Sequence, residues 1–91
     1  MTDDLRARIE RLHGPILVLG ASGFIGANLL RMLLGVRDDV FGTAGRRPAW
    51  RLEGLPEANV VVGDLLVESN LEGVLDRIRP ATVFDLSLIH I

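Results

Sequence analysis

The sequence predicts an α/β fold, a parallel β-sheet with helices packed on its faces. Short aliphatic runs alternate along the chain with segments whose apolar residues recur at helical spacing. Strands that alternate with helices need crossover connections, and these make neighbouring strands parallel. The run from Ile16 to Leu19 is apolar at every position, which is typical of a strand buried on both faces.

The composition excludes several classes of protein. The chain has 91 residues, enough for one domain or part of one, and 48% of them are hydrophobic. A net charge of −2 offers no basic surface for nucleic acid, and no apolar run approaches the ~20 residues that cross a bilayer. There is no Cys and no signal-peptide pattern, and His13 and His90 lack neighbours at metal-ligand spacing. We therefore expect a cytoplasmic protein with no metal and with neither nucleic-acid nor membrane partners.

The chain begins with a predicted helix and strand. Leu5, Ile9 and Leu12 share one face of a helix over residues 3–12. The first strand follows over residues 16–20.

The middle of the chain contains a second helix and two more strands. Apolar residues at helical spacing predict a helix over residues 24–35. A second strand, weakened by glycine, is predicted over residues 39–45, and a third over residues 59–64. A loop with a turn of helix around Trp50 connects them.

The last segment contains a helix and a fourth strand. Ser69 and Glu72 fit a capping box that would open the helix, and Pro80 marks its end. The fourth strand is predicted over residues 81–86.

The turn after the first strand carries the strongest functional signal. In Gly20-Ala21-Ser22-Gly23-Phe24-Ile25-Gly26, Gly20 permits a sharp turn, Gly23 permits close approach of a ligand, and Gly26 permits tight helix packing. The unpaired amides and positive dipole end of the following helix suit a pyrophosphate, to which Ser22 can add a hydroxyl donor. The alternative is a purely structural turn. The preceding buried strand and following amphipathic helix favour dinucleotide binding.

Three motifs resemble the extended short-chain dehydrogenase/reductase family, and its NAD-dependent epimerase/dehydratase branch in particular. They are "GASGFIG", "GDL" after the third strand, and "RPATVFDL" on the fourth, and the similarity covers residues 15–86. The resemblance implies a partial Rossmann fold of four strands in the order 3-2-1-4, with NAD or NADP as cofactor. It implies that Gly20, Gly23, Phe24, Ile25 and Gly26 line the pyrophosphate. It also implies that Asp64 and Leu65 meet the adenine, although Asp64 could instead cap the strand end.

Two arginines bear on which dinucleotide is bound. An acidic residue ~20 positions after the glycines usually binds the ribose 2′-hydroxyl, but residues 42–52 contain no carboxylate. Arg46 and Arg47 stand there instead and suit the 2′-phosphate of NADP. The alternative is that both simply solvate a loop. NADP is therefore favoured over NAD.

The family's catalytic pair is absent from this sequence. The resemblance implies a Tyr-x-x-x-Lys pair for acid–base chemistry, yet the chain has neither Tyr nor Lys. We therefore expect an N-terminal portion of a longer enzyme, with a helical extension over residues 1–14 and a cofactor-binding part over residues 15–85. The tail over residues 86–91 resembles a translated transposon end and is expected to be non-native, unless the strand simply continues.

The parent is expected to be an NAD(P)-dependent epimerase, dehydratase or reductase. Its small-molecule substrate would be a nucleotide sugar or a similar carbonyl or alcohol compound, and the parent could form a homodimer. A non-catalytic, NADP-sensing regulatory protein of the same fold is the alternative function.

Overall fold

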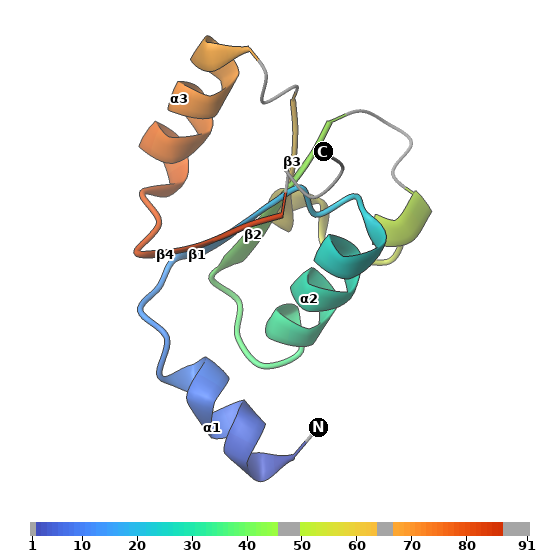
Figure 1. The fold of residues 1–91 in the computed structure, drawn as a ribbon, viewed down its shortest axis with the longest axis vertical. Coiled ribbons are helices and arrows are strands. Elements are labelled where there is room, and N and C mark those ends of the chain that lie inside the picture. Colours follow the sequence, from blue (N-terminus) through green and yellow to red (C-terminus); the bar gives the residue numbers. More distant parts are fainter. Residues whose placement is uncertain (1, 46–49, 64–66, 87–91) are drawn as a thin grey trace.

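The computed structural model describes residues 2–45, 50–63 and 67–86. Four parallel strands form a single sheet in the order β3-β2-β1-β4 (Figure 1). The predicted fold class and strand order are therefore confirmed. The strands are β1 (Ile16–Leu19), β2 (Val40–Ala44), β3 (Val60–Val62) and β4 (Thr82–Asp85).

One helix precedes the sheet and the others connect its strands, in the predicted order along the chain. The α-helices are α1 (Asp3–Glu10), α2 (Phe24–Leu34) and α3 (Glu68–Ile78). Two short 3₁₀ helices, η1 (Trp50–Leu52) and η2 (Glu57–Asn59), lie between β2 and β3. None of the helices in the described part of the chain is long and apolar enough to span a bilayer.

The core has two layers because alternate residues of β1 point to opposite faces of the sheet. Ile16 and Val18 pack in one cluster with Leu30 of α2, whereas Leu17 pairs on the other face with Val74 of α3. Helices α2 and α3 therefore cover opposite faces of the sheet (Figure 1). This double cover explains why β1 is apolar throughout.

The N-terminal helix is attached at the amino-terminal edge of the sheet. Thr2 caps α1 by accepting a hydrogen bond from the Leu5 backbone N–H at 3.2 Å. Ile9 is buried in the core cluster on the α2 side, and the Thr82 hydroxyl donates to the His13 carbonyl at 2.6 Å. Helix α1 thus contributes apolar surface to the same core as the sheet.

The start of α3 differs from the predicted capping box. The helix begins at Glu68, with Val67 as its N-cap and no side-chain capping bond. The backbone N–H groups of Asn70 and Leu71 both donate to the Val67 carbonyl. Because the helix starts earlier than predicted, Ser69 lies inside its first turn and is not its N-cap.

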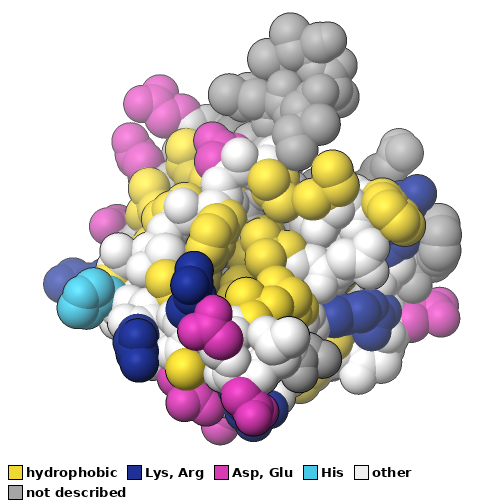
Figure 2. All heavy atoms as spheres, turned by 60° about the horizontal axis from the view of Figure 1, so that its bottom comes forward, with side chains coloured by type: hydrophobic (Ala, Val, Ile, Leu, Met, Phe, Trp, Pro, Cys, Tyr) yellow, Lys and Arg dark blue, Asp and Glu magenta, His cyan; other side chains and the backbone are white. Residues whose placement is uncertain are grey.

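Charged side chains are mixed in sign on the face drawn in Figure 2. There, basic and acidic side chains are interspersed around a central group of hydrophobic ones. This arrangement agrees with the small net charge of the sequence.

Candidate functional site

The glycine turn lies at the carboxyl edge of the sheet, directly after β1. Gly20 has a φ of 78°, a left-handed conformation that a residue with a Cβ rarely adopts. The chain leaves the sheet there, and Gly23 becomes the N-cap of α2. A parallel sheet with this topology binds ligands at its carboxyl edge, so the turn is placed where a ligand site is expected.

The other two glycines of the motif have different surroundings. A Cβ on Gly26 would overlap the Gly20 carbonyl oxygen and lie 2.9 Å from the Cα of Ala21, so the predicted tight packing of the helix is present. A Cβ on Gly23 would have its nearest protein neighbour, the Gly20 oxygen, at 3.7 Å, an ordinary contact. The fold therefore requires Gly26, whereas the space in front of Gly23 is available to a ligand.

The start of α2 offers backbone donors to an anion. No side chain caps this end of the helix, and its first turn contains no acidic residue. Phe24 and Ile25 are 71% and 57% exposed, although both are large and apolar. The amides of the first helical turn have no partner within the helix, and the helix dipole places positive charge beside them. Among the described residues, this is the helix end best suited to a phosphate.

Strand β2 shapes the turn through two residues, Gly42 and Thr43, that are not among the predicted site residues. A Cβ on Gly42 would meet the Leu30 side chain and lie 2.8 Å from the Cβ of Ala21, so this glycine permits close packing of the turn and α2. Thr43 is 2% exposed, and its Oγ1 accepts a hydrogen bond from the Gly20 backbone N–H at 3.0 Å. The sequence signal for Gly42 is a glycine inside a strand pattern, which can mark close approach of a neighbouring segment as well as a weak strand.

Arg51 also reaches the turn and is not among the predicted site residues. Its Nη1 donates to the Ser22 carbonyl at 3.4 Å. Arg31 of α2 holds the segment that carries Arg51, because its Nη2 donates to the carbonyls of Arg51 and Glu53. A cationic side chain is thereby placed beside the glycine turn. In the sequence, Arg51 could have been found as a third arginine after β2, following Arg46 and Arg47.

Four predicted site residues, Arg46, Arg47, Asp64 and Leu65, and the side chain of Trp50 lie outside the described part of the structure. The strands before them end at Ala44 and Val62, at the same edge as the glycine turn, and the Gly63 N–H donates to the Ala44 carbonyl at 2.9 Å. Asp38 and Asp39 precede β2 and lie at its opposite end, away from the glycine turn.

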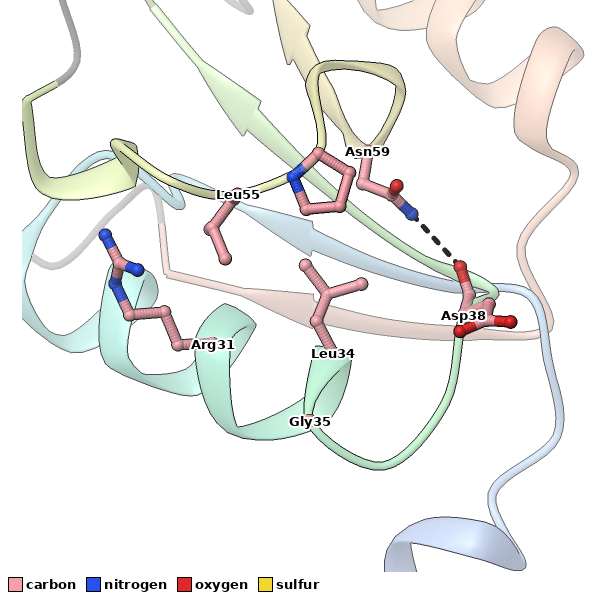
Figure 3. Close-up of a pocket in the computed structure, with 7 residues that line it drawn as sticks. Arg31, Leu34, Gly35, Asp38, Leu55 and Asn59 are labelled. Carbon is pink, nitrogen blue, oxygen red and sulfur yellow. Dashed lines mark hydrogen bonds between the residues drawn. The ribbon is translucent and has the colours of Figure 1, made fainter.

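The hollow drawn in Figure 3 is separate from the glycine turn. It has a volume of about 550 Å³ and lies between the end of α2 and the segment before β3. Leu34 and Leu55 point into it, and the Asn59 side chain donates to the Asp38 carbonyl at 3.0 Å. Asp38 and Asn59 precede their strands, so the hollow belongs to the amino edge, away from the glycine turn.

Comparison with known families agrees with the placement of the turn. The family model for the NAD dependent epimerase/dehydratase family matches residues 16–90, which is most of the chain. The chain belongs to the NAD dependent epimerase/dehydratase family. Membership in this family implies a nicotinamide dinucleotide cofactor and oxidoreductase-type chemistry. No curated protein and no solved structure gives a significant match to the chain.

Proposed function

We propose that the glycine turn and the start of α2 bind the pyrophosphate of NADP. The protein would serve as the cofactor-binding part of an epimerase, dehydratase or reductase acting on a nucleotide-sugar-like or other carbonyl or alcohol substrate. The observation that carries the proposal is the start of α2, which has no side-chain cap and follows a left-handed glycine turn in a chain of this family.

The described residues fit a pyrophosphate. Gly23 leaves room for oxygen atoms to approach the backbone, and no carboxylate in the first turn of α2 would repel them. Ser22 can add a hydroxyl donor, while Gly20 and Gly26 hold the turn against the sheet. When bound, the nicotinamide of the cofactor donates or accepts a hydride. Asp64 and Leu65 are proposed to contact the adenine.

The preference for NADP rests on positive charge after β2. Arg46 and Arg47 stand where an acidic residue would bind the 2′-hydroxyl of NAD. Arg51 adds a third guanidinium from the same segment, held at the Ser22 carbonyl. A guanidinium can bind a phosphate through two parallel hydrogen bonds, which a ribose hydroxyl cannot accept.

Binding to the glycine turn is tested by titrating the ¹⁵N-labelled 91-residue chain with NADPH. We expect the largest amide shifts within residues 20–26, and Gly23→Ala should weaken binding about tenfold because its Cβ occupies the approach path. Gly73→Ala, at an exposed position of α3, is the matched control and should bind like the wild type. A folded chain that shows no shifts with NADPH or NADH would contradict the proposal.

The NADP preference is tested separately with Arg46→Ala combined with Arg47→Ala. Loss of charged hydrogen bonds to the 2′-phosphate should weaken NADPH binding about tenfold or more. NADH lacks this phosphate and is the internal control. Equal loss for both cofactors would remove the case for a 2′-phosphate clamp.

A non-catalytic NADP sensor of the same fold is the second candidate, and only an enzyme would need the Tyr and Lys of the family's acid–base pair. Both candidates share the cofactor site and differ only in turnover. Hydride transfer by the intact protein, followed as NADPH absorbance with carbonyl substrates, would support the enzyme. Cofactor binding without turnover would support the sensor.

A further inference from the structure

The contact between β2 and the glycine turn departs from the regular strand ladder. The ladder begins where the Ile16 N–H donates to the Asp39 carbonyl at 2.8 Å, with Ile16 opposite Val40. In a parallel pair, every second residue repeats this bond. The same register would therefore pair the Gly20 N–H with the Thr43 carbonyl.

A one-residue offset occurs at this point. The Thr43 carbonyl accepts from the Ala21 N–H at 2.9 Å, one residue later than the ladder predicts. The Gly20 N–H, displaced from that carbonyl, donates to the Thr43 hydroxyl at 3.0 Å. One residue of β2 thus supplies both acceptors for two consecutive amides of the turn.

The side chain of Thr43 is polar although its surroundings are buried and apolar. Thr43 is the one buried polar or charged side chain among the described residues, and its neighbours along β2 are apolar or glycine. Valine has nearly the same shape and would avoid the cost of burying a hydroxyl. A valine, however, would leave the partly buried Gly20 N–H without this acceptor.

We propose that Thr43 is a positioning residue for the cofactor pyrophosphate, an inference that rests on the proposed function. By accepting from Gly20 through its side chain, Thr43 frees its carbonyl for Ala21 and stabilises the offset. The offset sets the path by which the chain leaves β1, and hence where the amides after Ala21 stand before α2 begins. Without the hydroxyl, the free protein relaxes to another turn geometry, and the cofactor must restore the original one on binding.

The test compares Thr43→Val with Thr43→Ser. Valine removes the hydroxyl and keeps the branched shape, whereas serine keeps the hydroxyl and removes a methyl group. The ligands are NADPH, ADP-ribose, which keeps the pyrophosphate, and adenosine 2′-monophosphate, which lacks it. Losing one hydrogen bond to a turn amide predicts about tenfold weaker binding of NADPH and ADP-ribose to Thr43→Val. Adenosine 2′-monophosphate should bind unchanged, and Thr43→Ser should bind all three like the wild type.

The outcomes separate the two proposals. If the wild type binds none of the three ligands, the proposed function fails. If it binds them and Thr43→Val weakens either all three equally or none, Thr43 has only a structural role and this inference is overturned. If Thr43→Val does not fold, Thr43→Ser decides, because its NADPH affinity should stay within about twofold of the wild type even though the lost methyl lowers its stability. Tenfold weaker NADPH binding by Thr43→Ser would overturn the inference.

Discussion

The guanidinium of Arg37 binds both carboxylate oxygens of Asp39, with Nε 2.6 Å from Oδ1 and Nη2 2.7 Å from Oδ2. This two-point contact fixes the plane of the guanidinium. Its remaining group, Nη1, donates to the carbonyls of Ile9 at 3.0 Å and Leu12 at 2.7 Å. The ion pair therefore orients a cation onto the carboxyl end of α1 and joins this helix to the sheet.

Removing that cation should release α1. An isolated helix of eight residues is marginal in water, so α1 depends on its tertiary contacts. We expect Arg37→Ala to speed hydrogen exchange of the α1 amides by about tenfold or more, with the β1 amides much less affected. Arg8→Ala, which breaks only an exposed pair with Asp4, is the matched control. Unchanged exchange in Arg37→Ala would show that contacts other than those of Arg37 hold the helix.

The same ion pair should make stability depend on acid pH. The hydrogen bond from Arg37 lowers the pKa of Asp39 below its ordinary value of 3.8. The carboxylate therefore contributes stability above that value, and the contribution is lost as the pH falls through the lowered pKa. In urea unfolding, Asp39→Asn should be less stable than the wild type at pH 7, with the difference shrinking below about pH 4. A difference that does not change with pH would contradict this assignment.

Gly26 should be the motif glycine that stability requires most. An alanine Cβ there would overlap backbone atoms of Gly20 and Ala21, which cannot move aside as a flexible side chain could. Gly26→Ala should lower the free energy of unfolding by about 1–3 kcal/mol, measured by urea denaturation. Gly23→Ala, whose Cβ makes only an ordinary contact, should change it far less. Equal effects of the two substitutions would argue against the packing role.

Gly73 offers a substitution that should stabilise the protein. It lies exposed in the middle of α3, and a Cβ there would meet no atom within 4 Å. Gly73→Ala should raise the free energy of unfolding by about 0.5–1 kcal/mol, because alanine loses less backbone entropy in a helix. Gly54→Ala is the contrast, since Gly54 has a φ of 85° and should lose stability despite open space. No gain in Gly73→Ala would mean that α3 contributes little to the folded state.

Much of the fold follows from local patterns in the sequence. The apolar run of β1, the helical spacing in α2 and the glycines between them predicted these elements because each depends on residues close together in the chain. The prediction of a capping box at Ser69 was wrong, because such a motif depends on where the helix begins as well as on residue spacing. Its spacing is correct, but the helix had already begun at Glu68.

Local patterns in the sequence were sufficient to predict the α/β class, the order of the elements and the glycine turn at the end of β1, since periodicity and turn chemistry are local properties. The distant groups that complete that turn became visible only in the folded structure. Thr43 lies 23 residues from Gly20, and Arg51 lies 29 residues from Ser22. Their contacts arise from strand register and from the packing of η1 against α2, and neither leaves a periodic signal in the chain. A single residue of register shift would give Thr43 a different partner, because alternate residues of a strand face opposite sides.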